Sequence, residues 1–133
     1  MLVAPAWIAK QLLRVNAPFS VSILSEIAAV AALNDSKYLQ RGVLEVQAER
    51  QMLLTAILER TPFKAWPSEG NFIIVDVSPY TSKMAVDTFL KNGVIVRSCD
   101  SFQNIGKNTI RITIGTKKQN RSLLKAFEAL KNA

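Results

Sequence analysis

The spacing of apolar residues changes at Thr61–Pro62, and the change separates a helical part of the chain from a part that contains strands. From Lys37 to about Arg60, apolar side chains recur every three or four positions or at multiples of that step, and Arg50 completes their row; they are Leu39, Val43, Val46, Leu53 and Ile57. This spacing places them on one face of a helix, and no proline interrupts it. We therefore predict one long helix that ends before Pro62.

The segments after Pro62 carry the patterns of strands. Phe72–Val77 is a short run rich in β-branched residues, and Asn108–Thr116 alternates isoleucine with polar residues at a period of two. Val94–Val96 predicts a further short strand, and helical segments lie between and after these runs. We expect a short β-sheet with helices packed on one face, preceded by two helices, which is an α+β fold.

Capping residues mark the boundaries of the other helices. One helix is expected after Pro18, one in the segment that precedes Gly93, and one at the end of the chain. The middle helix is expected to carry Val86, Phe89 and Leu90 on one face. The expected N-caps are Ser20 or Ser22, then Thr81 or Ser82, then a capping box formed by Thr116 and Gln119, with Gly93 just past the end of the middle helix.

The composition excludes several classes of chemistry. The sequence of 133 residues contains no histidine, so a Ser-His-Asp or Cys-His triad cannot form, and its single cysteine rules out a disulfide within the chain. No apolar run reaches the roughly 18 residues of a membrane span, and the N-terminal segment lacks the order of a signal peptide. We expect a cytoplasmic protein. The net charge of +7 favours an anionic ligand.

Two arginines are the candidate ligand-binding residues. Arg111 stands on the polar face of the Asn108–Thr116 strand, and Arg97 follows the Val94–Val96 run at the start of a loop. If both lie on adjacent strands, they can meet on one face and bind a carboxylate or phosphate with bidentate geometry. The alternative is that both are solvated surface side chains.

Two further positions carry weaker signals. Gly70 and Asn71 precede the first strand, where glycine can take a backbone conformation closed to other residues and asparagine can bond the backbone locally. A turn that starts the strand explains both equally well. Cys99 lies in the loop after Arg97, and without a histidine to activate it we interpret it as an unreactive thiol.

Four stretches of the chain, in this order and with these gaps, carry a family resemblance. They are "LVAP…LLRVNAPFSVSILSEIAAVAAL", "PSEGNFIIVDV", "LKNGVIVRSCDSF" and "NTIRITIGTKKQNRSLLKAFEAL". Together they resemble the C-terminal part of histidinol-phosphate aminotransferases, which are pyridoxal-phosphate enzymes of the fold-type I, aspartate-aminotransferase-like superfamily. The resemblance implies a tail of the large cofactor domain over 1–35, a long interdomain helix over 36–60 and a small C-terminal domain over 61–133.

The resemblance also implies an activity and residue roles. The intact enzyme would be a cytoplasmic homodimer that transfers an amino group between glutamate and imidazole-acetol phosphate in histidine biosynthesis. Arg111 matches the arginine that binds the substrate's carboxylate or phosphate, Arg97 matches one that approaches the phosphate, and Asn71 lies near the active site. The chain departs from the family at Gly70, where alanine is common, and at Ser20, where asparagine is common.

The resemblance implies that the catalytic centre lies upstream of these residues. The family's Schiff-base lysine, in a Ser-Lys motif, and its other cofactor-binding residues precede the matched region, and Lys10 does not match that lysine. We therefore expect a C-terminal fragment that has no catalytic or cofactor-binding residues of its own and is inactive alone, with pyridoxal phosphate bound in the intact enzyme only.

Other functions stay open at this point. A related threonine-phosphate decarboxylase, or another class I or II aminotransferase, shares the same pattern. The net charge and the basic residues of Lys117–Arg121 would support a nucleic-acid-binding module. Against it, aromatic and basic residues do not interleave on one strand face. A non-catalytic dimerisation or regulatory domain is the third alternative, because the apolar face of Ser20–Leu33 would favour self-association.

Overall fold

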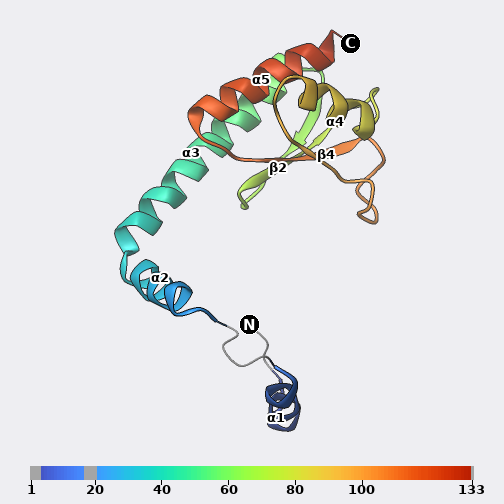
Figure 1. Ribbon diagram of the computed structural model, residues 1–133. Coiled ribbons are helices and arrows are strands. Elements are labelled where there is room, and N and C mark those ends of the chain that lie inside the picture. Colours follow the sequence, from blue (N-terminus) through green and yellow to red (C-terminus); the bar gives the residue numbers. More distant parts are fainter. Residues whose placement is uncertain (1–3, 17–20, 133) are drawn as a thin grey trace. The chain divides into compact units, whose positions relative to one another are not determined.

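The computed structural model describes residues 4–16 and 21–132 and divides the chain into two compact units, Met1–Leu39 and Gln40–Ala133 (Figure 1). The first unit contains α1 (Ala6–Val15), which we did not predict, and α2 (Ile23–Asn34). Ser22 caps α2 by accepting a hydrogen bond from the backbone N–H of Ser25, which confirms one of the two expected caps. The alternative, Ser20, lies outside the described residues.

The predicted long helix is confirmed as α3 (Ser36–Arg60). Asp35 starts it by accepting a hydrogen bond from the backbone N–H of Tyr38, and Thr61 follows its last residue with a hydroxyl bond to the Ile57 carbonyl. Leu53 and Ile57 are fully buried, whereas Leu39 and Val43 at the other end of the row are exposed. The apolar row therefore contributes to the core only from Val46, which is partly buried against it, onward.

The four-stranded sheet is antiparallel in the order β1-β2-β4-β3. Its central strands, β2 (Phe72–Asp76) and β4 (Thr109–Thr113), confirm two predicted strands. The strand predicted at Val94–Val96 is wrong, because the backbone of Val94 bonds to the end of a helix and pairing with β4 begins only at β3 (Arg97–Ser98). The short edge strand β1 (Lys64–Trp66) was not predicted.

Two further helices, α4 (Ser82–Lys91) and α5 (Lys117–Lys131), begin after expected caps, and α4 ends just before the expected glycine. Thr81 caps α4, and the Thr116–Gln119 capping box is present at the start of α5. Gly93 follows α4 with a φ of +74°, its N–H bonds to the Leu90 carbonyl, and the next N–H bonds to the Phe89 carbonyl. This is a Schellman motif, which requires a left-handed residue at that position.

One face of the sheet forms the core with α3, α4 and α5, which confirms the expected α+β arrangement (Figure 1). Alternate strand residues point into it, and they are Ile73, Val75, Val77, Ile110, Ile112 and Ile114. In the centre of the core, Phe89 and Phe127 pack edge to face, with 4.9 Å between their ring centroids. Leu90, which we expected on one face of α4 with Phe89, is 58% exposed, whereas Phe89 is fully buried.

Over the ranges that the structure describes, no helix combines the length and apolarity that crossing a membrane requires.

Candidate functional site

Arg97 and Arg111 are direct cross-strand partners between β3 and β4. Residues opposite each other in an antiparallel pair point to the same face, so both guanidinium groups lie on the face of the sheet that the helices leave open. The same row continues through Ile74 of β2 to Trp66 of β1. The prediction that these two arginines meet on one face is confirmed, although Arg97 lies within a strand and not at the start of a loop.

Each arginine of this pair lies over an aromatic ring and none of the described carboxylates forms an ion pair with either of them. The central guanidinium carbon of Arg111 is 5.4 Å from the ring centroid of Phe72, and that of Arg97 is 5.0 Å from the ring of Phe102. The Nε of Arg111 is buried and has no hydrogen-bond partner among the described residues. A buried N–H donor without a partner is costly, so an anion that accepts from it would be favoured.

The loop between β3 and β4 folds Phe102 back toward the arginine pair. Its first turn is closed by a bond from the Phe102 N–H to the Cys99 carbonyl at 2.9 Å. Asn104 and Gly106 take positive φ angles of 65° and 97°, which let the chain return sharply to β4. The hydroxyl of Thr109 bonds to the Ile105 carbonyl at 3.0 Å and fixes the end of the loop.

Cys99 lies buried beside both arginines. Burial raises the pKa of its thiol, while the positive charges of Arg111 and Arg97 act in the opposite direction. The net increase in this pKa keeps the sulfur protonated and therefore a poor nucleophile at neutral pH. This supports its interpretation as an unreactive packing residue.

Asn71, the third candidate, lies at the entrance of β2 and is exposed. Its carbonyl accepts a hydrogen bond from the Ile114 N–H at 2.8 Å, so its backbone extends the pairing of β2 with β4. Its neighbour Gly70 has no positive φ, so the conformation that only glycine adopts readily, which we considered for this position, is not used there. An added Cβ at this position would lie 2.9 Å from the Phe72 ring, so a larger residue would require the ring to shift.

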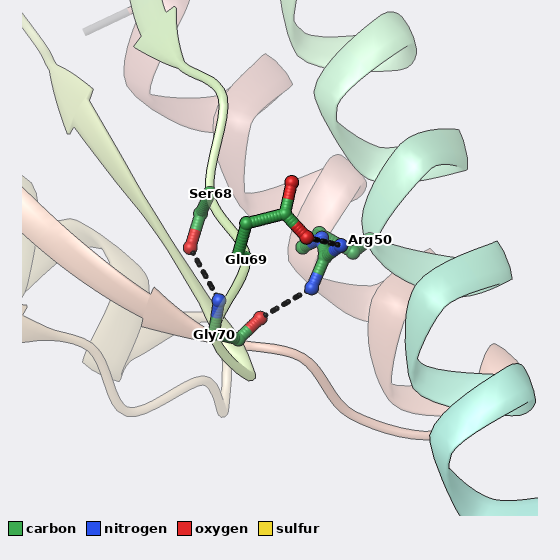
Figure 2. Close-up of polar contacts among 4 residues, drawn as sticks. All are labelled: Arg50, Ser68, Glu69 and Gly70. Carbon is green, nitrogen blue, oxygen red and sulfur yellow. Dashed lines mark hydrogen bonds and ion pairs between the residues drawn. The ribbon is translucent and has the colours of Figure 1, made fainter.

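Sequence reasoning missed the part that Arg50 plays here. Arg50 reaches from α3 to the turn before β2, where it donates to the Gly70 carbonyl at 2.9 Å and pairs with Glu69 at 3.2 Å (Figure 2). The available signal was a charged residue at a position where the helical row is otherwise apolar. A cation at such a position needs polar partners, and the turn provides them.

The lysines of the chain do not fit a Schiff base with a cofactor. Every lysine lies within the described residues and each is exposed, including Lys10. A lysine that forms a Schiff base is activated by removal from water or by a neighbouring cation in a closed pocket. Within the described ranges, likewise, His, Cys, Asp and Glu side chains do not gather in a group that could hold a metal ion.

The sequence matches one family model and is similar to several curated proteins. The family model for aminotransferase class I and II matches residues 1–127. The histidinol-phosphate aminotransferase of Methanosarcina mazei is 42% identical over 130 residues, which are 98% of this chain and 34% of that protein. The enzyme of the same name from Methanocella arvoryzae is 42% identical over 97% of this chain and 35% of its own length. The chain thus spans about a third of the curated relatives it matches.

Solved structures show the same fold. A histidinol-phosphate aminotransferase from Clostridium acetobutylicum covers 95% of this chain with 38% of its own length, at a TM-score of 0.84 and 21% identity. One from Sinorhizobium meliloti, in complex with pyridoxal-5'-phosphate, covers 93% with 34% of its length at a TM-score of 0.79 and 24% identity. An L-threonine-O-3-phosphate decarboxylase from Porphyromonas gingivalis covers 98% with 41% of its length, at a TM-score of 0.77 and 19% identity.

Proposed function

The chain belongs to the class I and II aminotransferase family, and on that premise we propose that it is the substrate-anion-binding part of a histidinol-phosphate aminotransferase. The intact protein would transfer an amino group between glutamate and imidazole-acetol phosphate. Identity of 42% to two enzymes of that name, over nearly the whole chain, supports this specificity. We further propose that the intact protein is a cytoplasmic homodimer, as the resemblance implies.

The cross-strand pair of Arg97 and Arg111 is the observation that carries the proposal. Two guanidinium groups that share an open sheet face, without carboxylate partners in the described chain, leave several donors for one anion. In the proposed role, Arg111 binds the carboxylate of glutamate or the phosphate of histidinol phosphate through its unpartnered Nε and a terminal nitrogen. Arg97 assists with its charge, and Asn71 contributes at the neighbouring strand end.

Pyridoxal phosphate, when bound in the intact protein, would supply the electron sink that amino transfer requires. The exposed lysines of this chain do not fit its Schiff base, so we propose that other residues of the intact protein hold it. The contribution of the arginine pair is to position the substrate. Binding energy on an anion remote from the reacting carbon orients that carbon and lowers the entropic part of the barrier.

Replacement of Arg111 in the intact enzyme tests the proposal. Arg111→Ala removes a charge-assisted bidentate contact, so kcat/KM for glutamate and for histidinol phosphate should each fall by a factor equivalent to about 2–4 kcal/mol. Arg111→Lys should recover part of the loss, because it restores the charge but not the bidentate geometry. Arg121→Ala is the matched control, since Arg121 lies exposed on α5, on the helical side of the sheet.

Two results would contradict the proposal. An unchanged kcat/KM in Arg111→Ala would remove the assigned role of the arginine pair. Release of carbon dioxide from threonine phosphate, with no amino transfer to imidazole-acetol phosphate, would reassign the protein to the decarboxylases that share this fold.

A further inference from the structure

Arg50 is a mostly buried cation whose hydrogen bonds are made to the turn that precedes β2. Its side chain is 13% exposed, and its Nη1 donates to the Gly70 carbonyl at 2.9 Å. The ion pair with Glu69 is made to a carboxylate that is 98% exposed, so this second contact contributes little. The bond to the Gly70 carbonyl is therefore the contact that fixes the turn to α3 (Figure 2).

The turn that Arg50 holds is packed against Phe72. The Gly70 N–H donates to the Ser68 hydroxyl at 3.0 Å, which closes the turn. A Cβ at position 70 would lie 2.9 Å from Cε1 and 3.2 Å from Cδ1 of the Phe72 ring. The Phe72 ring therefore lies in the space directly beside Gly70, so the position of this turn limits where the ring can lie.

Phe72 in turn supports the Arg111 guanidinium, which lies 5.4 Å from its ring centroid. Arg50 thus bonds the carbonyl of Gly70, the Phe72 ring fills the space that a side chain at position 70 would need, and Arg111 lies over that ring. We propose that Arg50 is a positioning residue, which holds the Phe72 ring in the place that directs Arg111 toward its anion. The proposal rests on the proposed function of Arg111 as the anion-binding residue.

The adjacent residue, Glu49, also bonds α3 to another segment, and this bond provides an internal control for the bond made by Arg50. Its carboxylate accepts from the Asn120 amide at 2.7 Å, and Asn120 also bonds the N–H and carbonyl of Gly115, each at 3.0 Å. Glu49 thus attaches α3 to the segment after β4. Its hydrogen bond goes to Asn120 and not to the Gly70 turn. If Arg50 only stabilises the fold, loss of the Arg50–Gly70 bond and loss of the Glu49–Asn120 bond should affect anion binding equally.

The test follows the Arg111 Nε–H resonance by NMR in this chain while chloride is replaced by inorganic phosphate at constant ionic strength. In the parent chain, phosphate should shift this resonance. Arg50→Met should change its starting position, since the Phe72 ring current is altered, and should weaken phosphate binding about threefold to thirtyfold, which lies within the range of coupling measured between neighbouring residues. Arg50→Lys, which can still reach the Gly70 carbonyl, should recover part of the affinity.

Matched variants separate positioning from loss of stability. Glu49→Ala should lower the unfolding midpoint but leave the Arg111 resonance and the phosphate affinity unchanged. Glu69→Gln should change neither property. Phe72→Leu should reproduce the Arg50→Met loss without touching α3, and the double variant should lose no more than either single variant, because both act on one chain of contacts. If Arg50→Met fails to fold, Arg50→Lys and Phe72→Leu still decide the matter.

The outcomes distinguish the two proposals. If the Arg111 resonance of the parent chain does not respond to phosphate, the anion-binding role itself is wrong. If the parent chain responds, and either Arg50→Met binds phosphate as well as the parent or Glu49→Ala loses as much affinity as Arg50→Met, positioning by Arg50 is overturned while the anion site stands.

Discussion

Asp76, at the end of β2, is a single residue whose charge should make stability depend on pH. The hydroxyl of Ser78 donates to its carboxylate at 2.6 Å and the backbone N–H of Ser78 at 2.9 Å. These two bonds lower the pKa of Asp76, the hydroxyl most strongly, and the charge of Lys64 adds a smaller effect in the same direction.

A lowered pKa in the folded state means that Asp76 stabilises the fold when it is ionised. This contribution is complete above the unfolded pKa of about 4 and disappears as the pH falls through the folded value. Asp76→Asn should therefore be about 1 kcal/mol less stable than the parent at pH 7, and the difference should shrink below pH 4. Urea unfolding at pH 7, 4 and 3 measures this, and a difference that does not vary with pH would contradict it.

Arg111 and Arg50 show how far residue roles could be predicted from sequence. The isoleucine alternation of β4 fixed the direction of Arg111, because a strand has only two faces and burial selects one. Arg50 lies on an equally regular row, but its partners are 19 and 20 positions further along the chain. No local pattern reports a contact of that separation.

At the scale of elements, two glycines permit a matched test of backbone strain. Gly42 lies within α3 and Gly93 just after α4, and an added Cβ meets nothing within 4 Å at either position. Only Gly93 has a positive φ, of 74°. Gly93→Ala should thus cost about 1–2 kcal/mol of unfolding free energy, whereas Gly42→Ala should increase it by up to about 1 kcal/mol. Chemical denaturation of both variants checks this, and equal signs would refute the assignment of strain to Gly93.

The ends of helices could be predicted where neighbouring residues in the sequence determine them. The ends of strands could not be predicted where they depend on hydrogen bonding to a distant strand. The caps at Thr81 and Thr116 are local, so α4 and α5 began where the sequence predicts. In the segment before Arg97, Val96 is buried and Ile95 is exposed, a difference that three consecutive apolar residues do not reveal in the sequence. Hydrogen-bond pairing there depends on where β4 lies, which is why the strand itself begins later.

At the scale of the whole molecule, the two compact units differ in what holds them together. Every residue of the hydrophobic core lies between Leu53 and Leu130. By contrast, α1 and α2 contain no buried residue, and α2 exposes large apolar side chains along its length, with Leu33 84% exposed. The stability of the second unit is therefore expected to be independent of the first, whereas apolar surface of this extent favours association.

A chain of residues 40–133 provides the corresponding test. It retains the whole core, so thermal unfolding followed by circular dichroism should stay cooperative, with a midpoint within about 4 °C of the full chain, equivalent to no more than about 1 kcal/mol. Light scattering should show less association than in the full chain, because the exposed residues of α1 and α2 are removed.

Changing Leu24, Ile27 and Leu33 of the full chain to Glu should reduce association equally without changing the midpoint. A shortened chain that is unfolded, or that associates as strongly as the full chain, would show that residues 1–39 contribute to the fold and do not merely expose apolar surface.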